Sequence, residues 1–122
     1  MATTKSASAI WSGTTLTASA AATTSDAVNL TDGYGATLDI KLTNGATGPT
    51  VAAQVQVQVS EDGTEYYNFG GPLIGSTVNS AIVSWGGIII PVGTQYLRCV
   101  AGSNTGQNVT VDADISEVTA IA

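Results

Sequence analysis

The residues of this 122-residue chain that could do chemistry are mainly its carboxylates. Asp112 and Asp114 stand two apart in a strand-like segment, so both project from one face. Glu61, Asp62 and Glu65 gather around a predicted turn. Such groups could hold a cation, or act as the acid and base of glycoside hydrolysis. The sequence favours a solvated face and a turn over either use, because nothing in the spacing brings six or more oxygen ligands together.

The aromatic side chains offer a second kind of site. Residues 66–69, Tyr-Tyr-Asn-Phe, form the densest aromatic cluster of the chain. Several aromatic rings on one exposed face would make a platform on which a sugar could stack. Core packing is the commoner use of large aromatic residues. We therefore expect Tyr67 and Phe69 to cap one end of the core and Tyr66 to face outward as a candidate exposed contact.

What the chain lacks narrows its chemistry. It contains no histidine, which excludes Ser-His-Asp and Cys-His triads, a histidine base and histidine-ligated zinc. Its single cysteine, Cys99, forms no intrachain disulfide and is expected to be a small buried residue. No glycine-rich run has the spacing of a phosphate or dinucleotide loop. We predict that the chain is not an enzyme and has no catalytic residue, no cofactor and no metal ligand.

The charges and apolar runs exclude two further classes of partner. Only Lys5, Lys41 and Arg98 are cationic, and the net charge is −6, so the chain has no basic patch for nucleic acid. The densest apolar run, residues 88–92, is far shorter than a membrane span. The first residues have no apolar stretch of signal-peptide length. We therefore expect no nucleic-acid and no membrane partner, and synthesis in a cytosol.

Alternation of apolar and polar residues with a period of two dominates the rest of the sequence. This pattern predicts strands with one buried and one wet face. It is clearest in residues 37–43, 54–59 and 109–116, and weaker in residues 96–101. Residues 82–92 are apolar on both faces and are interrupted by Gly86-Gly87, which indicates one or two strands with a bulge or bend.

Turn residues separate these runs, and no segment has the apolar stripe of a helix. Asp62-Gly63 lies between the valine-rich run and residues 66–69, which predicts a hairpin. Seven to nine short strands without crossover helices predict an all-β fold, an antiparallel β-sandwich with either jelly-roll or immunoglobulin-like connections. We place this single domain at residues 11–122.

The first ten residues differ in kind, since they are too polar to join a core. We predict that residues 1–10 form an N-terminal arm that is flexible or is ordered by a partner. Small side chains would let such an arm lie close along a neighbour, and a lysine could meet an acidic group there. The candidate partner-contacting residues are Ala2, Thr3, Thr4, Lys5, Ser6, Ala7, Ser8 and Ala9.

The predicted surface is unusual because only 10% of the residues are charged, while Ser and Thr make up close to a quarter. Soluble monomers normally carry more charge, which keeps them dispersed and blunts the edges of their sheets. Small neutral polar groups can pack against a neighbour without burying an unpaired charge. This composition favours a subunit of a large assembly.

Several segments resemble small structural proteins of tailed bacteriophages. The similar segments are strand and turn motifs that cover most of the chain, at residues 6–13, 42–49, 55–64, 91–98 and 101–118. The resemblance implies a virion component without catalytic residues, and we expect a capsid decoration (cement) protein. Such a protein would bind the major capsid protein on the surface of the assembled head, after synthesis in the bacterial cytoplasm.

A decoration protein stabilises contacts between shell subunits by binding the assembled shell in preference to the free subunit. Self-association into a trimer or dimer is expected at the symmetry axes of a shell. The alternative is a carbohydrate-binding or receptor-binding β-sandwich module of a phage tail or head fibre. Exposed aromatic residues sharing one face would favour that alternative, and a broad neutral face would favour a cement protein.

Overall fold

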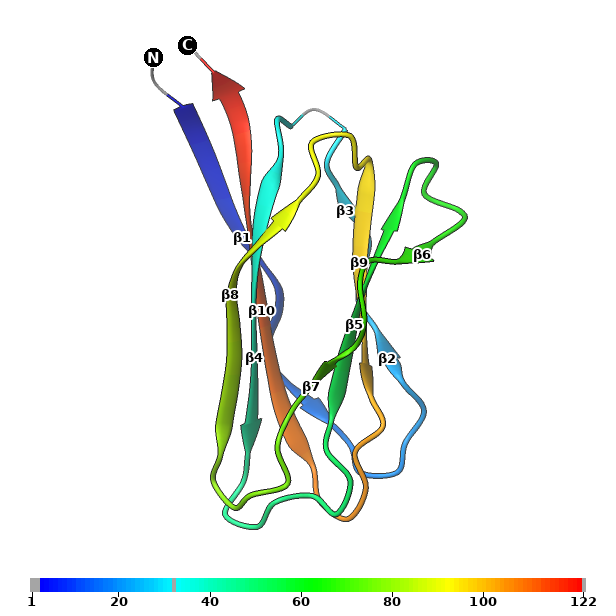
Figure 1. Ribbon diagram of the computed structural model, residues 1–122, viewed down its shortest axis with the longest axis vertical. Helices are drawn as coiled ribbons and strands as arrows, with labels where there is room; N and C mark the ends of the chain where they lie inside the picture. The colour runs from blue at the N-terminus through cyan, green and yellow to red at the C-terminus, as the bar shows by residue number, and fades with distance from the viewer. Residues whose placement is uncertain (1–2, 32, 122) are drawn as a thin grey trace.

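The computed structural model describes residues 3–31 and 33–121. These residues form ten strands in two antiparallel sheets packed face to face, with no helix among them (Figure 1). The predicted antiparallel β-sandwich is therefore confirmed. No helix in this part of the chain is long and apolar enough to cross a membrane.

Sheet A contains the long strands, and its order is β1-β10-β4-β8. The bounds of these strands are Thr3–Leu16, Val109–Ile121, Ala36–Asn44 and Ile82–Ile90. Pairing with β4 ends at Glu117 of β10, whereas pairing with β1 continues to Ile121. The two terminal strands thus project together as a ribbon beyond the rest of the sandwich (Figure 1).

Sheet B is built on two central strands, β5 and β9, whose neighbours are short. β2 and β3 pair with different parts of β9, and β6 and β7 pair with different parts of β5. Each outer strand of this sheet is therefore broken into two short pieces, a common way of blunting a sheet edge. The bounds of β5, β9, β2, β3, β6 and β7 are Gln54–Ser60, Tyr96–Gly102, Thr23–Thr24, Val28–Asn29, Tyr67–Asn68 and Leu73–Ile74.

The path of the chain decides between the two connectivities that the sequence left open. When each broken edge is counted as one strand, every sheet has four strands, and the chain crosses between the sheets at every connection except β5 to β6. In sheet A the first strand of the chain, β1, lies beside the last, β10. Strand β4, which is the third when each broken edge counts as one strand, lies between β10 and β8. This order is that of a jelly roll, a double sheet made of two Greek keys.

The core lies between the sheets and consists of the alternate residues of each long strand. Leu38, Ile40 and Leu42 of β4 are buried, as the alternation predicts, and so are the apolar residues of β5, β9 and β10. Cys99 is fully buried in this core, also as predicted. Burial raises the pKa of its thiol to about 12, so the thiol stays protonated and unreactive at neutral pH.

One row of residues across sheet A carries an irregularity in both edge strands. Trp11 pairs with Ala113, Ala113 with Ile40, and Ile40 with Trp85. The register of each edge strand shifts directly after its tryptophan. The two edge strands are thus bulged at the same level of the sheet. A two-fold axis between β10 and β4 would relate one bulge to the other. The bulge that Gly86-Gly87 predicted is confirmed, within a single strand.

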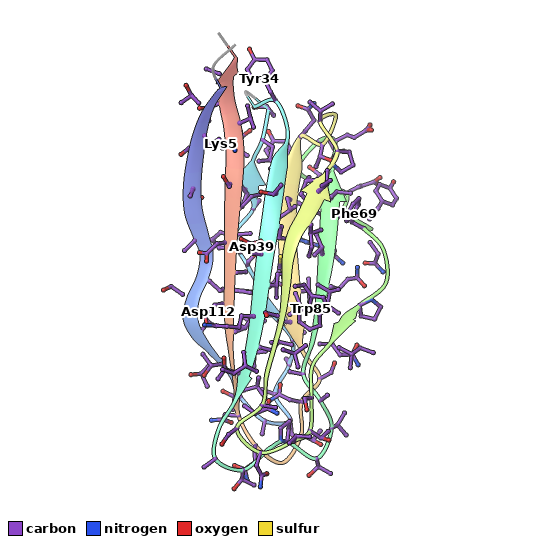
Figure 2. All side chains as sticks on the ribbon, turned by 60° about the vertical axis from the view of Figure 1, so that its left-hand side comes forward. Lys5, Tyr34, Asp39, Phe69, Trp85 and Asp112 are labelled. Atoms are coloured by element: carbon purple, nitrogen blue, oxygen red, sulfur yellow. The ribbon has the colours of Figure 1, made fainter. Side chains whose placement is uncertain are left out.

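Each bulge is held by a carboxylate from the neighbouring central strand. The backbone N–H of Gly13 donates to Asp112 Oδ1 at 2.8 Å, and that of Gly87 donates to Asp39 Oδ1 at 2.7 Å. The two glycines have φ values of 59° and 67°, where a residue with a side chain is strained. Figure 2 shows both carboxylates midway along sheet A. The aspartates satisfy amides that the interrupted ladder leaves unpaired.

The alternation in β5 gives a direct test of the register. Val57 is 3% exposed between the sheets, so Val57→Asp would bury an unpaired charge. We expect this change to cost about 5 kcal/mol or more, which is comparable with the whole stability of a small domain, and so to unfold the protein. Gln54→Glu, on the opposite face of the same strand, should stay folded. Thermal unfolding followed by circular dichroism measures both, and a stable Val57→Asp variant would contradict the register.

The bulge carboxylates should contribute measurably to stability. Asp112→Ala and Asp39→Ala each remove an acceptor from a bulge amide, and we expect each to lower the free energy of unfolding by about 1 kcal/mol. Asp112→Asn and Asp39→Asn keep an acceptor oxygen, so their free energies of unfolding should fall less than those of the alanine variants. Asp114→Ala is the control for Asp112→Ala, since Asp114 lies exposed on the same face of β10 and is paired in register with Asp39. Urea denaturation measures the free energy of unfolding of all five variants. Equal losses of stability for Asp114→Ala and Asp112→Ala would show that the hydrogen bonds to the bulge amides contribute nothing specific.

Candidate functional site

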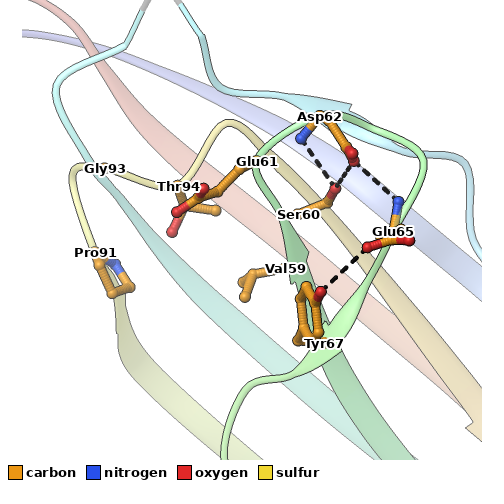
Figure 3. Close-up of a pocket in the computed structure, with 9 residues that line it drawn as sticks. All are labelled: Val59, Ser60, Glu61, Asp62, Glu65, Tyr67, Pro91, Gly93 and Thr94. Carbon is orange, nitrogen blue, oxygen red and sulfur yellow. Dashed lines mark hydrogen bonds between the residues drawn. The ribbon is translucent and has the colours of Figure 1, made fainter.

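A pocket of about 580 Å³ opens at one end of the sandwich, beside the turn that joins β5 to β6 (Figure 3). The carboxylate residues of the hairpin, Glu61, Asp62 and Glu65, line it together with Tyr67. Pro91, Gly93 and Thr94 of the loop between β8 and β9 form the opposite wall in the view of Figure 3. The predicted hairpin is confirmed, and it brings the clustered acidic residues to one pocket.

The carboxylate of Asp62 is occupied by the turn itself. Its Oδ1 accepts hydrogen bonds from the Glu65 N–H at 2.9 Å, the Thr64 N–H at 2.8 Å and the Ser60 hydroxyl at 3.0 Å. These bonds favour the charged form, that of the Glu65 N–H most, and they hold the pKa of Asp62 below its usual range. The described residues include no group of three or more acidic, histidine or cysteine side chains that could hold a metal ion. Asp62 thus acts as a structural group of the hairpin.

The aromatic cluster is divided between two sides of sheet B. Tyr67 pairs with Val59 and shares its side of the sheet, whereas Tyr66 precedes it and faces outward, as expected. Phe69 packs against the core, which confirms one of the two predicted caps. Tyr67 is 65% exposed because it faces the open pocket at the end of the sandwich, so the prediction that it would cap the core is wrong. The rings therefore do not share one flat platform.

Tyr66 is half-buried because a cationic side chain covers it. The guanidinium carbon of Arg98 lies 3.9 Å from the centre of the Tyr66 ring, a cation–π contact on the outer face of sheet B. The ring that reaches furthest into solvent in this cluster is that of Tyr67, whose hydroxyl donates to Glu65 Oε2 at 3.2 Å. A contact of Tyr66 with a partner stays a prediction.

Most of the candidate arm lies in the first half of β1. Ala2 lies outside the described residues, and residues 3–9 pair with β10 from Ile121 to Asp114. Side chains 4–9 are all exposed, so the segment joins the sheet through its backbone and contributes nothing to the core. In this structure it is continuous with residues 10–16 as one edge strand. The boundary after residue 10 and the contact with a partner stay predictions.

A second hollow, of about 440 Å³, lies on the outer face of sheet A near the chain ends. We call it the terminal groove, and its walls include Lys5 of β1, Tyr34, Ile89, Val92 and Val118. Ile89 is 74% exposed, Val92 68% and Tyr34 54%, so three large exposed apolar side chains line this groove. Figure 2 shows Lys5 and Tyr34 at the same end of the molecule.

Sequence reasoning did not find the terminal groove. Its residues come from four separate parts of the chain and are brought together by the pairing of β8 with β4, of β4 with β10 and of β10 with β1. One signal was present, since residues 82–92 are apolar on both faces. A strand at the edge of a sheet can bury only one of those faces, so the other must be exposed or covered by a partner.

Comparison with solved structures supports the fold. A chain of the infectious bursal disease virus VP2 subviral particle matches with a TM-score of 0.59 and 9% identity over 94% of this chain. The SPBc2 prophage-derived protein YomS matches with a TM-score of 0.57 and 10% identity, over 95% of this chain and 96% of its own. The structural neighbours thus include viral capsid proteins and a prophage protein.

A third neighbour is a family 16 carbohydrate-binding module, with a TM-score of 0.50 and 9% identity over 83% of this chain and 71% of that module. The chain spans about a third, 32%, of the length of the infectious bursal disease virus chains that it matches. No protein-family model matches the sequence. No curated protein matches it either. At these identities the likeness concerns the fold alone.

The turn carboxylate should make the stability of the protein depend on pH. Because the pKa of Asp62 is lowered in the folded chain, its contribution is complete above the unfolded pKa and is lost as the pH falls through the folded pKa. Asp62→Asn keeps an acceptor oxygen but does not titrate. We expect wild type to exceed Asp62→Asn in stability most above about pH 5, with the difference shrinking towards about pH 2. Urea titrations across this range measure it, and a difference independent of pH would contradict the role of the ionised carboxylate.

Proposed function

We propose that the chain is a non-enzymatic structural protein of a virion, and that it decorates an assembled capsid and stabilises contacts between the shell subunits. The observation that carries the proposal is the terminal groove beside the free edge of β1. An exposed apolar hollow and an open strand edge lie together at one end of sheet A. Exposed apolar patches of this kind commonly mark protein–protein contact sites.

The edge of β1 fits a neighbour that approaches closely. β1 is the outermost strand of sheet A, and Lys5 is the one charged residue among residues 3–9. The other side chains there are Ala, Ser and Thr, which leave the backbone N–H and C=O groups accessible to an added strand. A shell subunit that supplies such a strand would gain backbone hydrogen bonds at β1. Ile89 belongs to β8, at the opposite edge of the sheet, so the same subunit would have to reach across the outer face of sheet A to cover Ile89 and Val92.

Binding that prefers the assembled shell would stabilise it by mass action. Many symmetric copies would multiply a modest free energy of binding at each site. The fold shared with viral capsid proteins and with a prophage protein supports a virion role. The major capsid protein as partner, the capsid surface as location, and a trimer or dimer as the bound state belong to this proposal.

A carbohydrate-binding role is the second candidate, and one observation favours it. The largely exposed ring of Tyr67 stands at the pocket of about 580 Å³, beside the carboxylates of Glu61 and Glu65. An aromatic face with acceptor groups around it is suited to a sugar ring and its hydroxyl groups. The module of similar fold adds support at the level of the fold.

The two candidates are separated by substitutions on one strand. Ile89→Ser removes an exposed apolar side chain from the terminal groove, while Ile82→Ser removes a similarly exposed side chain from the far end of β8. We expect Ile89→Ser to weaken binding to purified shells of the virus that encodes the chain by about tenfold or more. Ile82→Ser should bind like wild type, and neither change should lower the melting temperature appreciably. Sedimentation of shells with labelled protein measures the binding.

Equal binding of wild type and Ile89→Ser to those shells would remove the terminal groove from the contact. Absence of shell binding by wild type would overturn the decoration role itself. Binding of wild type to a polysaccharide, lost in Tyr67→Ala and retained in Ile89→Ser, would establish the second candidate in its place.

A further inference from the structure

Arg98 is the single arginine of the chain and lies on the outer face of sheet B, on the opposite side of the molecule from the terminal groove. Its Nε donates to Gln58 Oε1 at 2.8 Å, across the pair that joins β9 to β5. The amide of Gln58 in turn donates to Asn68 Oδ1 at 3.1 Å. A chain of neutral polar groups thus fixes one edge of the guanidinium.

The flat face of the guanidinium is fixed as well, by the ring of Tyr66 at 3.9 Å. With its Nε bound and its face stacked, the side chain of Arg98 has little rotamer freedom left. Ordering a free arginine at an interface costs conformational entropy, and a partner that meets this arginine avoids most of that cost.

The two terminal nitrogens of Arg98 remain available. No hydrogen bond within the described residues engages either of them. The one buried side-chain atom without a partner in that part of the chain is Asn104 Oδ1, so both nitrogens reach solvent. Asp26, in the link between β2 and β3 beside β9, is exposed and forms no hydrogen bond to Arg98.

We propose that Arg98, held by Gln58 and Tyr66, is a binding site for a carboxylate, and that its ligand is an acidic side chain of a protein partner. The terminal nitrogens of a guanidinium match the two oxygens of a carboxylate, and an arginine whose planar fork is already oriented favours that geometry. Arginine and tyrosine are also, with tryptophan, the side chains that are enriched among the residues that dominate the free energy of binding at protein interfaces.

The charge of the whole chain makes this site selective. The net charge is −6, so an acidic partner is repelled at long range and is attracted only when it reaches Arg98. Recognition would therefore depend on short-range geometry at one guanidinium. The site is independent of the proposed function, which places the shell contact on sheet A.

A single arginine makes the test direct, because its Nε–H group gives one side-chain signal in a ¹⁵N-correlated NMR spectrum. Hexaglutamate, titrated into the whole protein at neutral pH, should shift this signal saturably, whereas hexaglutamine should not. Arg98→Lys, followed through the backbone amides of β5 and β9, should weaken hexaglutamate binding by about fivefold or more, since an ammonium lacks the fork. Lys41→Gln removes one positive charge from sheet A and is the matched control; it should bind like wild type.

Gln58→Glu gives a second variant that should stay folded. It supplies an internal carboxylate to Arg98, so it should abolish hexaglutamate binding while keeping the melting temperature at or above that of wild type. Asp26→Asn should leave affinity unchanged or raise it. The proposal is overturned if hexaglutamate leaves the Arg98 signal unmoved, or if Lys41→Gln weakens binding as much as Arg98→Lys. Tighter binding of glucuronate than of hexaglutamate would overturn the assignment to a protein carboxylate.

Discussion

The burial of alternate side chains between the two sheets is the interaction on which the rest of the structure depends. With only 10% of its residues charged, the chain derives its stability mainly from apolar area removed from water. The strand pleat then dictates that every residue next to a buried one points outward. Because Leu38 and Ile115 must face the core, their neighbours must face solvent, and the composition of both outer faces is left free for other uses.

The edges of the sheets follow from the same constraint, since a sandwich buries faces but leaves its outermost strands unpaired. Sheet B divides both of its edges into short pieces, and sheet A interrupts β1 and β8 at the level of Trp11 and Trp85. The carboxylates of Asp112 and Asp39 stabilise these interruptions because they accept hydrogen bonds from the backbone N–H groups that the interrupted pairing leaves free. Residues 5–9 then form the longest regular stretch of free edge in the described part of sheet A. The open edge lies next to the terminal groove, and that juxtaposition gives the proposed docking surface its shape.

The sequence predicted what depends on neighbours along the chain and missed what depends on strand order. Alternation gave the strands, their buried faces and the outward direction of Tyr66. It could not separate a jelly roll from an immunoglobulin-like sandwich, because long-range pairings set that choice. Tyr67 has the predicted direction, yet it is exposed because the pocket at the end of the sandwich lies open before it. The first residues looked too polar for the core, and they are outside it, but a sheet can recruit a segment through backbone hydrogen bonds alone. The groove at Ile89 and the fixed fork of Arg98 both need residues that only the folded chain brings together.

The two surfaces differ in chemistry and lie on opposite faces of a thin molecule. The terminal groove is apolar and neutral apart from Lys5, whereas the outer face of sheet B carries Arg98 on a row of neutral amides. A contact at the groove depends on dry packing and changes little with salt, while a contact at Arg98 depends on one charge, whose attraction added salt screens together with the long-range repulsion from the net charge of −6. A small sandwich with two such faces could join two different neighbours without their competing for one site. The stiff core between the faces would then carry the load from one neighbour to the other, because alternate residues of the same strands form the core and both outer surfaces.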